Sequence, residues 1–419
     1  MTPRVGDRAE GYVTELPYTL GYYPELNPRR INETLTAAGF GAVSIHRACE
    51  LGFGRGLSLA IHAIAGDAEW WGNDLLPAHV EEVRELTRDL PGRPEVFDQT
   101  FVEFCSRDDL PNFDFIAMHG VWSWISEDNR RVIKEFIDRK LRSGGVLYLS
   151  YNTRQGWASV LPLRDFLVSE AARPALAGRP LTERIEAALI AAQQVVARDL
   201  PPARDDPTFE KHLRTIRGKA KSYLAHEYFN RDWALFDEDD IAATFEPLGF
   251  RYVAQAKGCA KSTDTSGFRR DVWIRDRKGG LSESVPPKGS PTSTDPASVH
   301  TLNMRLLRRA LDEPYLSTLA SLSTGGGIEL GWRRLLALGA WSAGACEAGA
   351  IAAAVATAMA RLGHPYVHEG AVIADPAEVS SMLRREAEML FTSDLPRLRE
   401  LIGMSGFEPP VSAPAGGRR

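Results

Sequence analysis

The sequence predicts an α/β protein with a largely parallel sheet, a helical insertion and a second, smaller and mainly helical unit. Strands alternate with helices from about residue 43 to residue 151, which is the rhythm of βαβ units and of a parallel sheet. Two further strands, at 250–256 and 269–275, lie close enough in sequence to pair antiparallel. A sheet that ends in this way differs from a simple dinucleotide-binding fold.

Local signals place the individual elements. Asn27 and Pro28 predict the N-cap and first turn of a helix that runs to about residue 38. The five parallel strands are expected at 43–51, 69–74, 95–97, 113–119 and 146–151. The helices between them are expected at 56–65, 77–90 and 127–141, and Gly144 and Gly145 end the last one. Another helix is expected at 237–248, directly before the antiparallel pair.

The chain divides into two domains and two connecting or terminal segments. Residues 1–277 form the first domain, and its helical insertion at about 160–230 would lie on top of the sheet as a lid. Residues 278–300 are rich in Pro and Ser, which is typical of a linker. Residues 301–408 predict a mainly helical regulatory, substrate-binding or dimerisation domain, and 409–419 form a tail that cannot pack.

The composition is that of an ordinary globular protein, with 44% hydrophobic and 25% charged residues. A net charge of −5 gives no general attraction to nucleic acid or to an anionic membrane, so we expect neither as a partner. The apolar stretch 335–360 contains Glu347 and is rich in Ala and Gly. It favours a buried or interfacial helix over a membrane span, and with it a homodimer.

The four cysteines lie far apart, at positions 49, 105, 259 and 346, and form no C-x-x-C pair. This spacing argues against a zinc site and against a disulfide framework, so we expect no bound metal. Free cysteines fit a reducing compartment, and the first residues are too polar for a signal peptide. We therefore expect a cytoplasmic protein.

A glycine-rich turn follows the first strand and carries the strongest functional signal. Glu50 leads directly into Gly52, Gly54 and Gly56, and Asp74 follows 24 positions after Glu50. Glycines permit a backbone turn tight enough for a flat ligand to lie against the main chain, where a Cβ would collide. A carboxylate at the end of the second parallel strand is placed to bind ribose hydroxyls. The pattern indicates a nucleoside-bearing ligand.

The acid before the turn narrows the choice of ligand. Dinucleotide folds use G-x-G-x-x-G, with the helix N-terminus aimed at a pyrophosphate, but here the third glycine comes one position early. A buried Glu50 would repel a pyrophosphate and attract the ammonium of a methionine group. The turn therefore favours S-adenosylmethionine (SAM) over NAD, and a glycine turn without a ligand is the alternative.

The candidate cofactor-binding residues follow the ends of the predicted strands, or precede them in the aromatic segment near the N-terminus. The loop after the third strand offers a backbone amide and an apolar side chain to flank an adenine. The full set is Tyr22, Glu50, Gly52, Gly54, Gly56, Asp74, Thr100, Phe101, His119 and Gly120.

Methyl transfer from a sulfonium needs alignment and exclusion of water, and a lysine acceptor must be neutral. Aromatic rings also attract a cationic sulfonium or ammonium. The candidate catalytic residues are Tyr18, His119, Trp122 and Tyr151. At least half of the aromatic residues near the strand ends are expected to be packing residues. His119 is either a proton acceptor or a satisfied polar residue, and residues 226–228 either close over the substrate or lie on the surface.

Several segments together resemble one family. They are Glu-Leu-Pro-Tyr at 15–18, Glu-Leu-Gly-x-Gly-x-Gly at 50–56, His-Gly-Val-x-Ser-Trp at 119–124, Ser-Tyr-Asn-Thr at 150–153 with Gly-Trp at 156–157, and His-Glu-Tyr at 226–228. Over residues 10–275 the chain resembles the bacterial class I SAM-dependent methyltransferases that carry a methyltransferase regulatory domain. That group includes protein-lysine methyltransferases acting on bacterial surface proteins.

The resemblance implies a Rossmann-like, seven-stranded sheet that binds SAM, with Glu50 and the glycines at the methionine end and Asp74 at the ribose. It also implies that the insertion and the C-terminal unit select or gate the substrate. The chain departs from the pattern at Phe53, Arg55 and Gln155, and its C-terminal unit is shorter than in the lysine methyltransferases.

The leading hypothesis is a SAM-dependent methyltransferase that acts on an amine, foremost a protein lysine, and yields S-adenosylhomocysteine. The shorter C-terminal unit motivates an alternative, an O- or N-methyltransferase of a sugar or secondary metabolite. Because the sequence contains no unmistakable general base, a third hypothesis is a SAM-fold binding protein without turnover.

Overall fold

The computed structural model describes residues 11–16, 18, 23–64, 66–219, 221–256 and 267–276, and beyond them 298, 302, 305, 366–368, 371–373 and 381. The expected linker, helical domain, small-residue stretch and tail lie outside the described residues apart from those positions. Within the expected helical domain, β8 (Tyr366–His368) pairs antiparallel with β9 (Ala371–Ile373), which the sequence did not predict.

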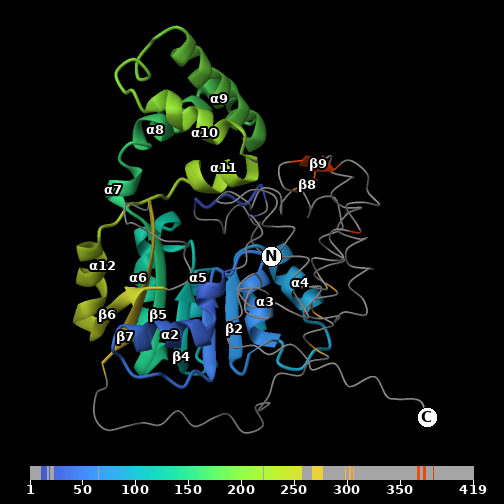
Figure 1. The fold of residues 1–419 in the computed structure, drawn as a ribbon, viewed down its shortest axis with the longest axis vertical. Helices are drawn as coiled ribbons and strands as arrows, with labels where there is room; N and C mark the ends of the chain where they lie inside the picture. The colour runs from blue at the N-terminus through green and yellow to red at the C-terminus, as the bar shows by residue number, and fades with distance from the viewer. Residues whose placement is uncertain are drawn as a thin grey trace.

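A seven-stranded sheet in the order β3-β2-β1-β4-β5-β7-β6 forms the centre of the described chain (Figure 1). All neighbouring strands pair parallel except β7, which is antiparallel to both β5 and β6. The predicted α/β fold with a closing antiparallel pair is confirmed. The strands are β1 (Arg47–Leu51), β2 (Glu69–Asp74), β3 (Glu95–Asp98), β4 (Phe113–Met118), β5 (Leu141–Asn152), β6 (Phe250–Gln255) and β7 (Phe268–Arg275).

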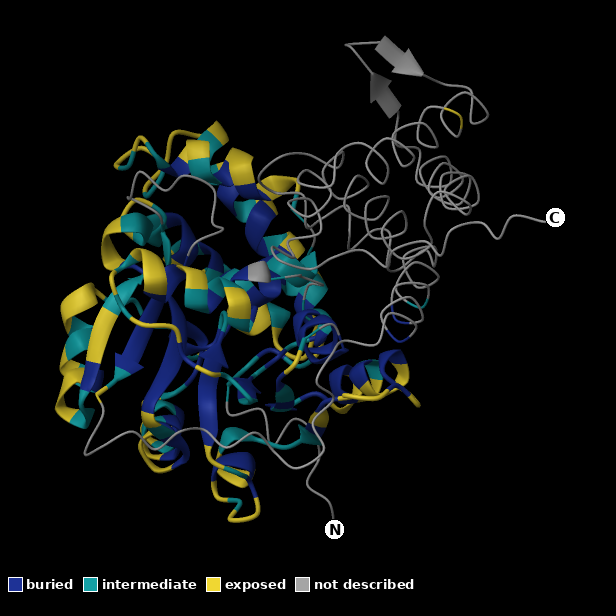
Figure 2. Cartoon of the chain, turned by 60° about the horizontal axis from the view of Figure 1, so that its bottom comes forward, coloured by how far each residue is buried: buried dark blue, intermediate teal, exposed yellow. Residues whose placement is uncertain are grey.

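Helices cover both faces of this sheet. One side carries η1 (Pro24–Leu26), α2 (Pro28–Ala37), α3 (Leu57–Ile64) and α4 (Pro77–Leu86), and the other carries α5 (Phe101–Cys105), α6 (Glu127–Lys140) and α12 (Glu238–Phe245). Two short 3₁₀ helices, η2 (Trp122–Trp124) and η4 (Glu246–Leu248), complete this α/β/α arrangement. Figure 2 shows the strands buried between the layers and the exposed residues on the outer surfaces of the helices.

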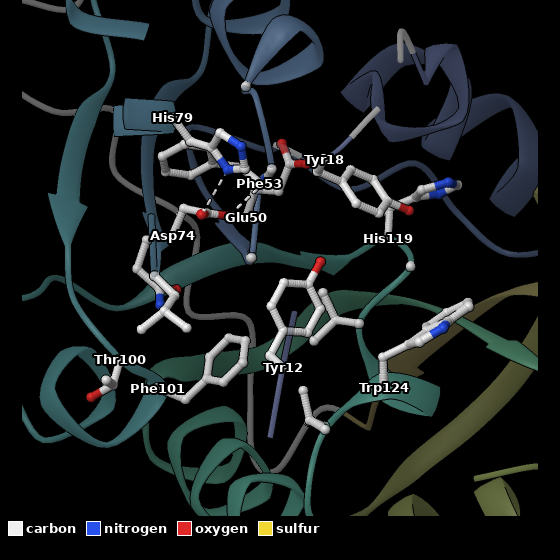
Figure 3. A pocket seen from close by; sticks show the side chains of 18 of the residues that line it. Tyr12, Tyr18, Glu50, Phe53, Asp74, His79, Thr100, Phe101, His119 and Trp124 are labelled. Carbon is white, nitrogen blue, oxygen red and sulfur yellow. Dashed lines mark hydrogen bonds and ion pairs between the residues drawn. The ribbon is translucent and has the colours of Figure 1, made fainter. Parts of the chain in front are cut away.

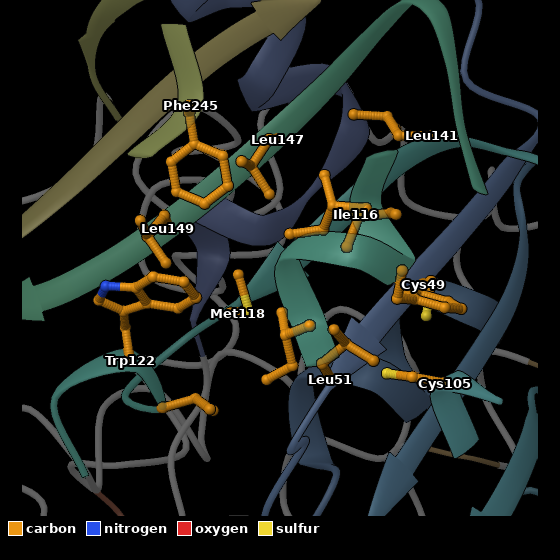
Figure 4. Close-up of a cluster of buried hydrophobic side chains, with 14 of the residues drawn as sticks. Cys49, Leu51, Cys105, Ile116, Met118, Trp122, Leu141, Leu147, Leu149 and Phe245 are labelled. Carbon is orange, nitrogen blue, oxygen red and sulfur yellow. The ribbon is translucent and has the colours of Figure 1, made fainter. Parts of the chain in front are cut away.

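The alternation of side chains along each strand builds two separate cores. Cys49 and Leu51 of β1 face α5 and α6, whereas Ala48, the residue before Cys49, faces α2 and α3. Successive side chains of a strand point to opposite faces, so a strand covered on both sides reads as a continuous apolar run. β4 shows this directly, because all six of its residues are buried. Figure 4 shows the core on the α6 side.

Several elements differ from the expected boundaries. β1 begins four residues later than expected, and α4 ends four residues earlier. β5 begins at Leu141, five residues early, because Leu141 pairs with Phe113 before the register of the two strands shifts. Helix α5 was not expected, although its signal is present in the sequence. Thr100 caps the helix: its side chain accepts a hydrogen bond from the Glu103 N–H, and the Glu103 side chain accepts one from the Thr100 N–H. This capping box satisfies two of the amide groups that a helix N-terminus leaves free.

The stretch at about 160–230 is helical in the structure. It contains α8 (Leu161–Ala171), η3 (Pro174–Leu176), α9 (Leu181–Ala197), α10 (Phe209–Arg217) and α11 (Lys221–Tyr228), joined to β5 through α7 (Arg154–Trp157). Its helices share a core of their own, into which Val13 of the N-terminal segment packs. Figure 1 places this helical insertion above the ends of the central strands. Among the described residues, no helix has the length and apolar character needed to cross a membrane.

Candidate functional site

A pocket opens at the carboxyl ends of β1, β2, β3 and β4 (Figure 3). Its walls come from the turn after β1, the last residues of β2, and the loops that follow β3 and β4. Tyrosines of the N-terminal segment close it from a further side. Parallel strands bring their carboxyl ends to one edge of the sheet, which is where α/β folds form ligand crevices. Ten of the thirteen predicted site residues line this pocket: Tyr18, Glu50, Gly52, Gly54, Gly56, Asp74, Thr100, Phe101, His119 and Gly120.

The glycine turn forms one wall of the pocket. Gly52, Gly54 and Gly56 all have positive φ angles, of 65°, 60° and 67°. A Cβ on Gly52 would come within 2.8 Å of Val121 Cγ2, and one on Gly54 within 3.3 Å of Tyr18 Cδ1. The glycines therefore permit both the left-handed backbone and the close approach of neighbouring groups.

Asp74 holds the turn in place from the end of β2. Its Oδ2 accepts a hydrogen bond from the Gly54 N–H at 2.8 Å. Its Oδ1 accepts one from the Leu76 N–H at 3.0 Å and lies 2.9 Å from His79 Nδ1. Figure 3 shows the contacts of Asp74 with the turn and with His79. Because Oδ2 has a second lone pair, Asp74 can still accept a hydrogen bond from a ligand in the pocket.

Glu50 is buried at the base of the turn, with 2% of its surface exposed. Its Oε2 has no hydrogen-bond partner among the described residues. Burial in the first place, and then the negative charge of Asp74, raise the pKa of Glu50 to about 8. A buried acceptor without a partner costs free energy, and a cationic donor in the pocket would remove that cost.

His119 sits at the end of β4 inside a group of rings and charges. Its Nδ1 lies 2.8 Å from the Tyr148 hydroxyl, and its ring stacks on Tyr23 at a centroid distance of 3.7 Å. Burial and then the positive charge of Arg270 lower its pKa well below the usual value. Arg270 is paired in turn with Glu25 at 3.0 Å. His119 is therefore neutral at pH 7, and its Nδ1 is engaged with Tyr148.

Two predicted catalytic residues lie in the core instead of the pocket. Trp122 packs against Phe245 with ring centroids 5.6 Å apart, and Figure 4 shows it inside the apolar cluster. Tyr151 is fully buried, and its hydroxyl donates a hydrogen bond to Asp271 Oδ2 at 2.7 Å. Tyr151 points toward α12 because side chains alternate along β5. In η2, Trp122 points into the core and Trp124 lines the pocket. Trp122 and Tyr151 are therefore packing residues and not the catalytic residues that the sequence predicted.

Replacing Tyr151 by phenylalanine tests this correction. The variant loses one buried hydrogen bond, so we expect the free energy of unfolding to fall by about 1–2 kcal/mol. Because the hydroxyl does not reach the pocket, we expect ligand affinity and any turnover to stay within about twofold of the wild type. Chemical denaturation and a binding titration measure the two quantities. A large loss of turnover with unchanged stability would restore Tyr151 to the site.

The remaining predicted residue, Tyr22, lies outside the described residues, and its neighbour Tyr23 lines the pocket. Sequence reasoning missed several lining residues, among them Tyr12, His79, Gln99 and Asn129. His79 had a signal, since it stands in the first turn of the helix after Asp74. Within the described residues, no group of three or more His, Cys, Asp or Glu side chains is arranged to hold a metal ion.

The N-terminal segment joins the helical insertion to the pocket. The ring of Tyr18 contacts the ring of His226 edge-on at 5.0 Å, and Tyr12 contacts the same ring at 5.4 Å. The Val13 N–H donates to Asn230 Oδ1 at 2.8 Å, and His226 Nε2 lies 3.0 Å from the Leu16 carbonyl oxygen. Helix α11 is thereby held directly behind the two tyrosines that line the pocket.

Sequence comparison finds relatives that carry no functional description. No family model matches the chain. An uncharacterized protein of Synechocystis sp. is 35% identical over 253 residues, which is 59% of this chain and 49% of that protein. An uncharacterized protein of Rickettsia prowazekii is 31% identical over 157 residues, or 37% of this chain and 28% of that protein. The chain thus matches less than half the length of either relative.

Structure comparison finds the same architecture in PKMT2 from Rickettsia typhi, solved in complex with AdoHcy (S-adenosylhomocysteine). The TM-score is 0.55 at 13% identity, and the alignment covers 92% of this chain and 100% of PKMT2. The fold is that of the class I methyltransferases. The predicted fold class is confirmed by this likeness, which at such low identity concerns the fold alone.

Proposed function

We propose that the chain is a SAM-dependent methyltransferase that transfers a methyl group to an amine, foremost the side chain of a protein lysine. The observation that carries the proposal is the buried, unpartnered Oε2 of Glu50 beside three left-handed glycines in a pocket at the sheet edge. The fold shared with PKMT2, which was solved with AdoHcy, supports SAM as the cofactor.

The residues of the pocket fit SAM along its length. Glu50 would bind the ammonium of its methionine end, and the glycine turn leaves room for that end against the backbone. Asp74 would bind the ribose hydroxyls, and Phe101 with the backbone at Thr100 would flank the adenine. When bound, SAM supplies an electrophilic methyl group on a sulfonium.

The chain's own contribution is alignment, exclusion of water and accommodation of cations. Tyr12, Tyr18, Tyr23 and Trp124 line the pocket with aromatic rings, which attract cationic groups. Neutral His119 adds no positive charge that would repel them. We further propose that the helical insertion acts as a lid, because α11 is bonded to the segment that carries Tyr12 and Tyr18.

A deletion strain tests the acceptor. Proteins and small molecules from the strain and its parent are compared by mass spectrometry, and the purified chain with labelled SAM is then used to restore the missing methyl groups. The proposal expects a protein lysine that is methylated in the parent only. A methylated sugar or metabolite hydroxyl would support the alternative acceptor, and absence of transfer by a chain that binds SAM would indicate a binding protein.

We also propose that the protein is cytoplasmic and forms a homodimer. A cytoplasmic location is supported by Cys49 and Cys105, which are buried and free in the structure. Homodimer formation rests on the sequence pattern at 335–360, and size-exclusion chromatography with light scattering would test it.

The raised pKa of Glu50 predicts that SAM binds more weakly in acid. The cofactor's ammonium favours the ionised carboxylate, so binding lowers the pKa of Glu50 from about 8 and expels its proton. Below pH 8, affinity should therefore fall by up to about tenfold for each unit of pH. Calorimetric titrations with SAM at pH 6.0, 6.75 and 7.5 measure this trend. Glu50→Gln should bind SAM at least about tenfold more weakly than the wild type, and its affinity should not change with pH. A wild-type affinity that is equally independent of pH would contradict the proposal that Glu50 binds the ammonium of SAM.

A further inference from the structure

Helix α11 brings a carboxylate close to the tyrosines that line one side of the pocket. Glu227 directly follows His226, whose ring contacts the rings of both Tyr12 and Tyr18. Electrostatic interaction links Glu227 with three tyrosines that line the pocket, namely Tyr12, Tyr18 and Tyr23. The helical insertion thus brings a titratable group to the same aromatic wall that the N-terminal segment builds.

Glu227 is partly buried, and the described residues give it neither a hydrogen-bond partner nor an ion-pair partner. Burial raises its pKa to about 7. The tyrosines around it have raised pKa values, mainly through burial, and stay protonated near neutral pH. Glu227 therefore changes charge near pH 7. A carboxylate without a cation, next to several rings, is the arrangement that binds an ammonium.

We propose that Glu227, together with the rings of Tyr12 and Tyr18, forms the acceptor subsite: it holds the ammonium of the acceptor and takes up the proton that the amine loses. This inference rests on the proposed methyltransferase function. An N–H bond of the ammonium breaks and an O–H bond forms on Glu227. The freed nitrogen lone pair then attacks the methyl carbon, a C–N bond forms, and the C–S electron pair stays on sulfur.

The acidity of the groups favours an amine over a hydroxyl. A lysine ammonium has a pKa of about 10.4, roughly three units above that of Glu227, whereas the pKa of an aliphatic hydroxyl lies far higher. Proton transfer to Glu227 is therefore uphill by about three powers of ten for an amine and by much more for a hydroxyl. The subsite selects amines both by charge and by the ease of deprotonation.

The charged and titratable surroundings of Glu227 come from three elements. The N-terminal segment contributes Tyr12 and Tyr18, and Tyr23 precedes η1. Helix α11 itself contributes His226, Tyr223 and Tyr228. Farther along the pocket, Asp74 acts on Tyr12 and Glu50 acts on Tyr23. Glu50 also titrates near neutrality, so the test is made with S-adenosylhomocysteine bound, whose ammonium holds Glu50 ionised.

The test measures binding of n-butylamine, a lysine side-chain mimic, and of uncharged n-butanol to the S-adenosylhomocysteine-saturated protein by ligand-observed NMR. Glu227→Gln keeps the shape and removes the charge. Glu183→Gln is the matched control, because Glu183 lies on α9 of the same insertion with a 57% exposed side chain. Circular dichroism and the affinity for S-adenosylhomocysteine confirm that each variant is folded.

We expect Glu227→Gln to weaken butylamine binding at least about tenfold at pH 8 and to leave butanol binding within twofold. Wild type and Glu183→Gln should bind butylamine more tightly as pH rises from 6 to 8, since Glu227 ionises, whereas Glu227→Gln should give a flat profile. Equal butylamine binding and equal pH profiles in wild type and Glu227→Gln would overturn the inference, as would wild-type protein that binds butanol and no butylamine. Failure of S-adenosylhomocysteine itself to bind would instead overturn the proposed function.

Discussion

Replacing Gly56 by alanine is expected to lower the free energy of unfolding by about 2–5 kcal/mol. The new Cβ would lie 2.0 Å from Val83 Cγ2, so α3 and α4 would have to move apart. Forcing an atom into a packed core costs about 1–3 kcal/mol. The left-handed φ of +67° adds about 1–2 kcal/mol for a residue with a Cβ. Since Gly56 ends the turn that lines the pocket, affinity for S-adenosylhomocysteine should fall as well. Denaturant unfolding with and without the ligand measures both effects.

The chain offers a matched control at Gly249. Its φ is +82°, and a Cβ there would meet nothing within 4 Å, so alanine should cost only the backbone strain of about 1–2 kcal/mol. The clash itself is tested in a Val83→Ala background, where Gly56→Ala should cost about the same as Gly249→Ala. If Gly56→Ala costs no more than Gly249→Ala in the wild-type background, the close packing of the turn on α4 is wrong.

Asp74→Ala is expected to weaken S-adenosylhomocysteine binding by at least about a hundredfold. The carboxylate would accept a hydrogen bond from the ribose through Oδ2, and a hydrogen bond to a charged group contributes about 1.5–3 kcal/mol. Its loss also leaves the Gly54 N–H, the Leu76 N–H and His79 without their acceptor. The turn then loses its anchor to β2. Isothermal titration calorimetry measures the affinity, and thermal unfolding reports the accompanying loss of stability.

Two further variants serve as controls for Asp74→Ala: Asp74→Asn and Asp109→Ala. Asparagine keeps one acceptor oxygen, so the fold should be nearly retained while affinity still falls at least about tenfold. Asp109 is a 66% exposed aspartate that pairs with Arg107 away from the pocket, and its removal should leave binding unchanged. An Asp74→Ala protein that binds S-adenosylhomocysteine within threefold of wild type would remove Asp74 from the cofactor site.

The sequence predicted the parts of the fold and site that depend on local pattern. Alternating strands and helices predicted the parallel sheet, and the short gap before β7 predicted its antiparallel pairing. Glu50 and Asp74 could be placed together because parallel strands bring their carboxyl ends to one edge. The glycines were recognised because their conformation is one that few other residues adopt.

The sequence could not predict which side chains face the pocket where this depends on packing between distant segments. Tyr151 and Trp122 stand next to strand ends, but their direction is set by the face that each strand or turn presents to α12. Tyr12 lines the pocket, and its segment is hydrogen-bonded to residues in and just after α11, more than two hundred positions later in the sequence. Burial raises the pKa of Glu227, and the sequence of residues 226–228 alone does not show how deeply this side chain is buried.

Isothermal titration calorimetry of the purified chain with S-adenosylhomocysteine and with SAM measures directly whether the pocket is a cofactor site. We expect both compounds to bind at one site per chain, and each to bind at least about a hundredfold more weakly to Asp74→Ala. A folded chain that binds neither compound would show that the pocket is not a SAM site.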